Sequence, residues 1–229
     1  MVALEDPDQQ VAGTGIAALR EAGVEVEIGC RSDEAERQLA AYLHHRRTGR
    51  PYVIVKLAAT LDGRTAAPDG TSQWITGEAA RTDGHRLRAE SQAIVVGAGT
   101  VRADNPSLTT RLVDGPDPQR IVLGSASPEA RIHPCLEWRG DLGELLDQLG
   151  ADGVLQLMVE GGANTTAQFH ADGLVNRYVA YLAPAMFGGD DARPLFVGNG
   201  ASTIDALPRG RFENVTQLGA DIRVELIID

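Results

Sequence analysis

From residue 52 onward, the chain alternates between short apolar runs and segments with helical periodicity. The apolar runs predict strands near 52–59, 92–97, 119–124, 154–159 and 176–185, then a closing pair at 211–219 and 222–228. Helical periodicity marks 77–90, 141–150 and 163–171. Such alternation is typical of a parallel sheet with helices on its faces, and the closing pair adds an antiparallel edge. We therefore predict an α/β domain with a mostly parallel central sheet and flanking helices. In the first helix of this domain, we expect Thr76 to be the N-cap and Glu78 to lie in the first turn.

The first fifty residues form a separate pattern. Residues 11–23 have helical spacing with a stop at Gly23, 24–28 alternate like a strand, and a second helix is predicted from Ser32. A polar segment that contains several arginines, Gly49 and Pro51 follows, and we expect it to connect the two parts of the chain. We therefore expect one unit at 1–50 and the main domain at 51–229.

Composition limits the classes of partner. The chain has 229 residues, is 43% apolar and carries a net charge of −11, which disfavours binding to nucleic acid. Between residues 56 and 111, however, seven basic residues face six acidic ones. A nearly neutral window in an acidic chain suits a small anionic ligand better than a polymer.

Metal and membrane signals are weak. The two cysteines, Cys30 and Cys135, lie far apart, and the five histidines and two cysteines form no H-x-x-x-H or C-x-x-C spacing, so we expect no metal ion. No run of 18 apolar residues and no basic leader is present. We therefore expect a soluble cytoplasmic protein that does not bind membranes.

Lys56 is the only lysine among 21 basic residues, and it lies within the apolar run 52–59. Desolvation opposes its charge there unless a partner is close. A lysine in such a setting suggests a functional ammonium. A Schiff-base lyase or a pyridoxal phosphate enzyme is an alternative reading, which imine absorbance would reveal.

Two predicted strands end in glycines that precede helical residues, at Gly97–Thr100 and Gly161–Asn164. Glycine lets a backbone approach a phosphate, and the N–H groups of the following helix can bind an anion. The first junction lacks the third glycine of the Rossmann motif. A dinucleotide held in another fold is one reading, and a simple packing role for the glycines is the other.

Five polar or aromatic residues are further candidates. Arg88 and Arg111 can bind phosphate bidentately, although either can also be a surface charge. Trp74 suits a stacking surface or the core, and Asp104 suits a site or a turn. Glu160 follows a buried strand at its carboxyl end, where α/β proteins bind ligands.

Several motifs together resemble the reductase domain of the bacterial bifunctional riboflavin-biosynthesis deaminase/reductase. They are KLAATLDGRTA at 56–66, SQWIT at 72–76, GAGTVxxDxPxLTxR at 97–111, VEGG at 159–162 and YLAPxxFGG at 181–189. The resemblance covers 51–229. It implies a dihydrofolate-reductase-like fold, NADPH as cofactor and a homodimer.

The resemblance also implies residue roles. Substrate contacts fall on Ser72, Arg88, Leu108, Arg111 and Glu160. NADPH contacts fall on Ala58, Trp74, Thr100, Asp104, Ser125, Gly162, Ala163, Asn164, Thr165, Thr166, Ala167 and Gln168. The candidate catalytic residues are Lys56, Asp104 and Glu160.

The implied reaction is NADPH-dependent reduction of 5-amino-6-(5-phosphoribosylamino)uracil, a phosphorylated pyrimidine, to its ribityl form. Two alternatives remain open at this point. A pterin reductase of the same fold would use the arginines for a glutamate carboxylate. A non-catalytic relative would bind the nucleotide without turnover, although the presence of Lys56, Asp104 and Glu160 speaks against it.

The run 177–187 is apolar on both alternating faces. More apolar surface lies here than a strand with one solvated face needs. The run is therefore either a subunit interface or a central strand covered by helices.

Residues 1–50 resemble the tail of the deaminase domain, through EDPDxxVAGxGI at 5–16. The zinc-binding H-x-E and P-C-x-x-C motifs of that domain are missing from the sequence, which suits either a natural stand-alone reductase or, as we expect, a fragment of a longer chain. This chain is therefore expected to contain no stoichiometric zinc and to keep its reductase activity in EDTA. Ammonia release from the diaminopyrimidinone precursor, or activity restored by zinc after chelation, would contradict this prediction.

Overall fold

The computed structural model describes residues 1–8 and 10–228. Contacts group the chain into two compact units, one of residues 1–52 with 146–155 and the other of residues 53–145 with 156–229. In the described part of the chain, no helix combines the length and apolar character needed to cross a membrane.

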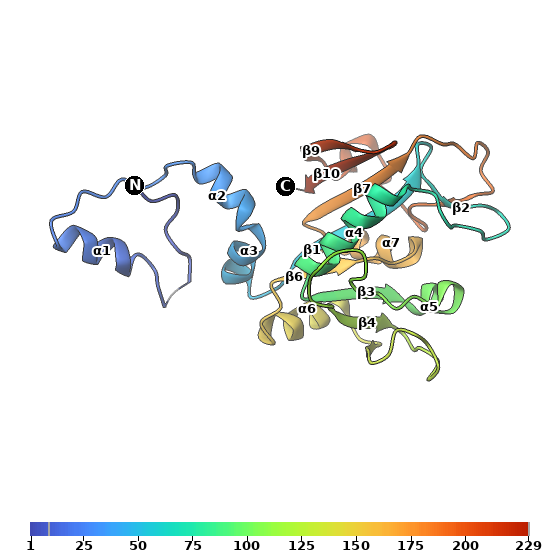
Figure 1. Cartoon of the computed structure of the whole chain (residues 1–229), viewed down its shortest axis with the longest axis horizontal. Helices are drawn as coiled ribbons and strands as arrows, with labels where there is room; N and C mark the ends of the chain where they lie inside the picture. The colour runs from blue at the N-terminus through green and yellow to red at the C-terminus, as the bar shows by residue number, and fades with distance from the viewer. Residues whose placement is uncertain (9, 229) are drawn as a thin grey trace. The chain divides into compact units, whose positions relative to one another are not determined.

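The larger unit is built on an eight-stranded sheet (Figure 1). Its strands in chain order are β1 Tyr52–Thr60, β3 Ala93–Gly97, β4 Gln119–Leu123, β5 Leu136–Trp138, β6 Gln156–Val159, β7 Arg177–Ala183, β9 Gly210–Leu218 and β10 Asp221–Ile228. In space they follow the order β5-β4-β3-β6-β1-β7-β10-β9. Strands β3, β4, β5 and β6 pair in parallel, as do β1 and β7, whereas β10 runs antiparallel to β7 and β9. The predicted mostly parallel sheet with an antiparallel C-terminal pair is confirmed.

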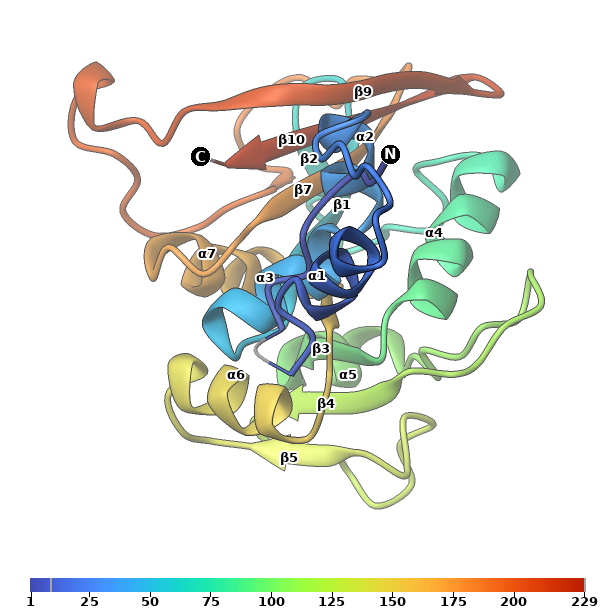
Figure 2. The same cartoon turned by 90° about the vertical axis from the view of Figure 1, so that its left-hand side faces the viewer.

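Helices cover both faces of this sheet. The helices of the larger unit are α4 Glu78–Glu90, α5 Ala98–Asp104 and α7 Ala163–Ala171, with a 3₁₀ turn at Ile204–Ala206. Helix α6 Leu142–Ala151 is divided between the two units, with residues 146–151 in the smaller one. Helix α4 lies on one face and α7 on the other (Figure 2). Residues 93–96 of β3 are completely buried, because a strand covered on both sides must be apolar at every position.

The short elements lack a signal in the sequence. A two-stranded sheet joins β2 Arg64–Ala66 to β8 Arg193–Pro194. These strands, together with β5 and α5, have seven residues or fewer, too few for a clear periodicity. The Thr76 N-cap was wrong, because Gly77 precedes the first helical residue and donates its N–H to the Asp221 carboxylate at 2.7 Å.

The smaller unit contains α1 Thr14–Glu21, α2 Ser32–Gln38 and α3 Ala40–Thr48. The strand predicted at 24–28 was wrong: only Ile28 forms a bridge, to Val2, so no ladder stabilises an extended run. Segment 146–155 joins this unit through a hydrogen bond of 2.9 Å between the His45 ring and the Gly150 carbonyl. Nothing in the local sequence signals that association.

The apolar run 177–187 is explained by the sheet. Strand β7 lies between β1 and β10, and Val179 and Tyr181 are at most 1% exposed. The central-strand alternative is therefore the observed one, and an interface through β7 itself is wrong. The exposed part of the run is residues 184–187, which lie beyond the strand.

Candidate active site

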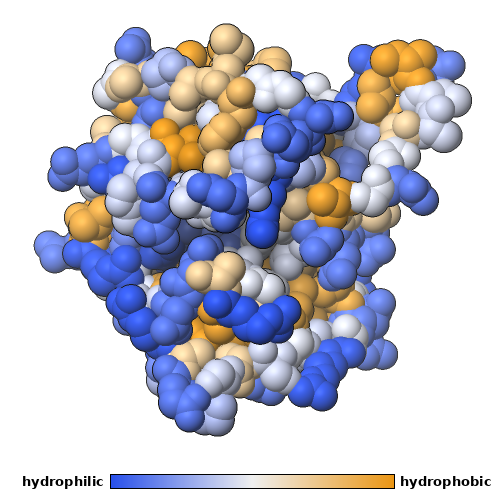
Figure 3. Space-filling view, turned by 90° about the vertical axis from the view of Figure 1, so that its right-hand side faces the viewer, coloured by the Kyte–Doolittle hydropathy of each residue, from blue (hydrophilic) through white to orange (hydrophobic). Residues whose placement is uncertain are grey.

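A cavity of about 1450 Å³ opens near the carboxyl ends of β1, β3 and β6, within the larger unit (Figure 3). The same edge of the sheet carries the first turns of α5 and α7. Among the described residues that line the cavity, seven are basic and three are acidic, an excess of four positive charges in a chain of net charge −11. The basic residues are Lys56, Arg81, Arg88, Arg102, Arg111, Arg131 and Arg193. This charge pattern suits a ligand with several phosphates.

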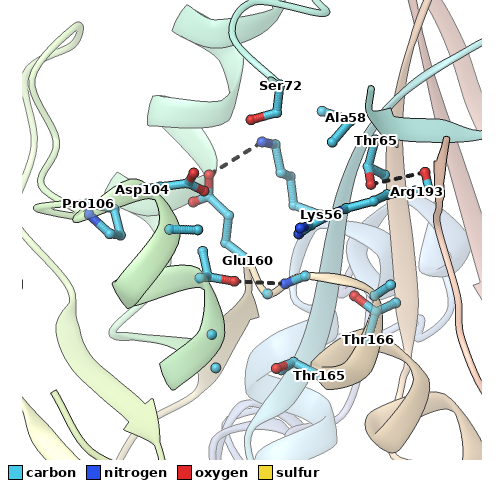
Figure 4. Close-up of a pocket in the computed structure, with 18 of the residues that line it drawn as sticks. Lys56, Ala58, Thr65, Ser72, Asp104, Pro106, Glu160, Thr165, Thr166 and Arg193 are labelled. Atoms are coloured by element: carbon cyan, nitrogen blue, oxygen red, sulfur yellow. Dashed lines mark hydrogen bonds and ion pairs between the residues drawn. The ribbon is translucent and has the colours of Figure 1, made fainter. Parts of the chain in front are cut away.

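Lys56, Arg88 and Glu160 form a charged cluster in the cavity wall. The Lys56 ammonium lies 3.3 Å from Glu160 Oε1, and the two side chains point toward each other (Figure 4). Arg88 donates from Nε to Oε2 and from Nη2 to Oε1, both at 2.8 Å. These side chains are only 12–19% exposed. Glu160 is therefore the partner that the charge on Lys56 requires.

The cluster determines the protonation state of Glu160. Burial by itself raises the pKa of this carboxyl, but Lys56 and Arg88 outweigh burial and lower the pKa to about 2. Burial also opposes the charge on Arg88, yet Glu160 raises the pKa of that guanidinium above its ordinary value. At neutral pH, Glu160 is thus a carboxylate that accepts hydrogen bonds and has no proton to donate.

Arg88 differs from the expected phosphate ligand. Its two donors on one edge bind the Glu160 carboxylate, and Nη1 donates to the Thr109 carbonyl at 3.1 Å. The fork that would meet a phosphate is occupied by a carboxylate. The structure therefore favours Arg88 as the residue that holds Glu160 in place.

Arg111 is better suited to an anion. Its Nη1 donates to the hydroxyls of Ser107 and Thr109, and no carboxylate of the described residues forms an ion pair with it. The neighbouring Leu108 is 3% exposed and has a positive φ of 53°, so the backbone turns here to aim the Arg111 side chain at the cavity.

The two glycine junctions lie side by side. Thr100 at the first junction accepts a hydrogen bond from Gly162 N–H of the second, at 3.2 Å. A Cβ on Gly97 or on Gly161 would approach Thr165 to 2.6 or 2.5 Å. Packing thus explains these two glycines. The prediction of anion binding therefore depends on the N-termini of the helices that follow, α5 and α7. Neither of these helices has a side-chain N-cap hydrogen bond.

Trp74 lies in the cavity wall and is 68% exposed, which rules out the core alternative. The Arg81 guanidinium lies 4.7 Å from the centre of its ring. Ser72 lines the same cavity, within the segment 69–76, all of whose residues line it. An exposed indole next to a cation is suited to stack against a flat, electron-rich ring.

Asp104 ends α5 and also lines the cavity. Burial raises the pKa of this carboxyl, and Arg193 opposes the rise. Sequence reasoning did not single out Arg102, Arg131 or Arg193, since isolated arginines form no pattern. Their shared position around one cavity appears only in the fold.

A comparison with known protein families shows which family the chain belongs to. The model of the RibD C-terminal domain matches residues 51–224. The chain belongs to the RibD C-terminal domain family. Riboflavin biosynthesis protein RibD of Bacillus amyloliquefaciens is 38% identical over 261 residues, which cover 99% of this chain and 70% of that protein. RibD of Chlamydia muridarum is 41% identical, over 85% of this chain and 62% of its own length.

Solved RibD structures share the fold. Acinetobacter baumannii RibD, form 1, superposes with a TM-score of 0.89 at 34% identity, over all of this chain and 72% of that one. A Thermotoga maritima protein described as a diaminohydroxyphosphoribosylaminopyrimidine deaminase/5-amino-6-(5-phosphoribosylamino)uracil reductase gives 0.84 at 26% identity, over 71% of its chain. The present chain thus spans about two thirds of the length of its RibD relatives.

Most residues expected from the RibD resemblance meet in one place. The cavity lining contains Lys56, Ala58, Ser72, Trp74, Arg88, Thr100, Asp104, Leu108, Arg111, Glu160, Gly162, Ala163, Asn164, Thr165, Thr166 and Gln168. Ser125 and Ala167 do not line it. Ser125 follows the turn at Gly124, and its hydroxyl accepts a hydrogen bond from Arg139 instead. Ala167 lies on α7 between cavity residues Thr166 and Gln168.

Proposed function

We propose that this chain reduces the ribosyl group of 5-amino-6-(5-phosphoribosylamino)uracil to ribityl, with NADPH as the reductant. The observation that carries the proposal is the Lys56–Glu160–Arg88 cluster at the wall of a strongly basic cavity. The description of the Thermotoga relative names a reductase of the same substrate. The cluster and the cavity lie in the larger unit, and deamination by the whole RibD protein lies outside this proposal.

The residues of the cavity fit a nicotinamide dinucleotide phosphate. The first turn of α7 presents backbone N–H groups that no side chain caps, and Arg102, Arg131 and Arg193 line the same cavity. A Cβ on Gly162 would approach the Thr100 hydroxyl to 3.3 Å, so glycine allows the two junctions to pack closely beside the first turn of α7. When bound, NADPH supplies a hydride.

Lys56 and Glu160 divide the proton chemistry. Reduction at C1′ of the opened ribose adds a hydride to carbon and a proton to the neighbouring heteroatom. The Lys56 ammonium carries a proton that it can donate, whereas the Glu160 carboxylate, with its pKa near 2, has none at neutral pH. We therefore assign proton donation to Lys56, and we assign to Glu160 the role of orienting the Lys56 ammonium.

The test is NADPH oxidation measured side by side with the deaminated pyrimidine nucleotide and with dihydrofolate. Turnover of the pyrimidine alone is the expected result. Turnover of dihydrofolate alone would replace the proposal with a pterin reductase, and tight NADPH binding without turnover of either would indicate a non-catalytic relative.

Arg111→Ala is expected to raise KM for the phosphorylated substrate by about tenfold or more, because one charge-assisted contact to the phosphate is lost. KM for the dephosphorylated substrate should change much less. Steady-state kinetics with both forms measure the difference, and Arg86→Ala, which removes an exposed arginine from α4 outside the cavity, is the control. Equal losses for the two forms would reject the phosphate assignment.

We further propose that the protein is a homodimer, as the family resemblance implies. Strand β7 is excluded as the contact, because it is buried within its own sheet. A surface that remains available is the edge strand β9 with its neighbour β10, where Phe212, Val215 and Ile222 are exposed. A light-scattering mass of one chain at micromolar concentration would contradict the dimer.

A further inference from the structure

The segment 105–111 forms one wall of the cavity without any regular secondary structure. It carries Leu108 and Arg111, and both Asn105 and Leu108 have positive φ angles, of 40° and 53°. Backbone N–H and C=O groups outside helices and sheets need other partners, and positive φ is costly for residues other than glycine. Something must therefore hold this segment in its observed path.

Helix α4 supplies two of those partners from one face. His85 Nδ1 accepts a hydrogen bond from the Arg111 backbone N–H at 3.0 Å, and Arg88 Nη1 donates to the Thr109 carbonyl at 3.1 Å. His85 and Arg88 are three residues apart, so they project from the same side of the helix. The same helix that holds Glu160 through Arg88 thus also holds the main chain of Arg111.

His85 is chemically suited to accept this hydrogen bond and is not suited to transfer a proton. The residue is 6% exposed, and burial, together with the charges of Arg88 and Arg111, lowers its pKa to about 4. The ring is therefore neutral at neutral pH. Nδ1 accepts the Arg111 N–H in the neutral tautomer that carries its proton on Nε2. In that tautomer the 3.5 Å contact between Nε2 and the donor Arg88 Nη1 is not a hydrogen bond.

We propose that His85 is a positioning residue for the anion subsite, which it orders by accepting the Arg111 backbone N–H through Nδ1. Without this acceptor, a partly buried N–H loses its partner, and the segment 105–111 loses one of the two hydrogen bonds that join it to α4 among the described residues. The Arg111 guanidinium would then sample several directions. Binding of a phosphate would have to order this side chain, which makes the binding free energy less favourable. The inference rests on the proposed function only in taking a sugar phosphate as the ligand.

The experiment compares two substitutions at this position. His85→Leu removes the acceptor, whereas His85→Asn keeps one, because the Asn amide oxygen lies close to where Nδ1 was. Affinity for ribose 5-phosphate is measured by titration calorimetry at pH 7.5, with NADPH affinity and the melting temperature as readouts of an intact fold. His85→Leu is expected to bind ribose 5-phosphate about tenfold more weakly with NADPH affinity unchanged, and His85→Asn to stay within about threefold of the parent.

Each outcome decides the point. If His85→Leu binds ribose 5-phosphate as the parent does, or if His85→Asn is as weak as His85→Leu, the acceptor role is wrong. A loss of NADPH affinity equal to the loss of ribose 5-phosphate affinity would show general damage and also overturn it. If the parent reduces no pyrimidine but the two variants behave as expected, the proposed function fails while the role of His85 stands.

Discussion

Replacing Lys56 with methionine is expected to lower kcat/KM by about 10²-fold or more while the protein stays folded. Methionine keeps the length of the side chain and removes the only donor assigned to the proton. The fold should tolerate the change because Glu160 keeps both hydrogen bonds from Arg88, so no buried carboxylate loses its last partner. Steady-state kinetics and thermal unfolding of the variant measure the two parts of this prediction.

Two companion variants sharpen the result. Arg86→Met removes one positive charge from an exposed position on α4 outside the cavity, and its activity should remain close to that of the parent. Lys56→Arg keeps the positive charge but donates a proton poorly, since a guanidinium stays protonated in proteins. Near-parental turnover by Lys56→Met would return Lys56 to a structural role, whereas loss in both Lys56 variants supports proton donation.

Glu160→Gln is expected to have the largest effect on stability, a loss of about 2–4 kcal/mol at neutral pH. The carboxylate lies between the Lys56 ammonium and the Arg88 guanidinium, and the amide would leave two partly buried cations without an anion between them. For a chain of this size the loss corresponds to a melting temperature lower by roughly 4–16 °C. Glu144→Gln, at an exposed position on α6, is the control and should change the melting temperature little.

The pH dependence of stability should identify the same carboxyl. The pKa of Glu160 lies near 2 in the folded protein, against an ordinary value of 4.5. A lowered pKa means that the stabilisation is complete above about pH 4.5 and is lost as the pH falls toward 2. The shift corresponds to about 3 kcal/mol.

Denaturant unfolding at pH 7 and at low pH measures this contribution. Glu160→Gln should lack that part of the acid destabilisation, so the free-energy gap between parent and variant should narrow as the pH falls below 4.5. A gap that stays constant between pH 7 and pH 3 would show that the ion pairs with Lys56 and Arg88 do not stabilise the fold.

The order of strands and helices can be predicted from the sequence because their signals are local. Apolar runs of strand length and helical periodicity arise within a few consecutive residues, so the sequence pattern locates seven strands of the sheet and helices α4, α6 and α7. The segments that failed depend on distant partners. Residues 24–28 find only Val2 to pair with, and Gly77 becomes the N-cap through Asp221, 144 residues away.

The candidate site likewise contains residues that the sequence identifies and contacts that depend on distant parts of the chain. Lys56 stands out because a lone ammonium in an apolar run conflicts with desolvation, and that conflict is visible in the sequence. Its partner Glu160 is a separate candidate there, because the pairing depends on β1 and β6 being neighbours in the sheet. The resemblance to known reductases supplies most of the remaining cavity residues, and it also includes Ser125, which does not line the cavity and whose hydroxyl accepts a hydrogen bond from Arg139.

The sequence by itself determined the fold class, the two glycine junctions and the unusual lysine, since each is a property of a short segment. Only the tertiary structure decided that Arg88 binds Glu160, that the Arg111 side chain lines the cavity and that His85 accepts the Arg111 backbone N–H. Those assignments depend on which side chains from separate elements come within about 3 Å of one another. Such distances are set by strand order, by helix placement and by the path of loops such as 105–111, none of which leaves a periodic trace in the chain.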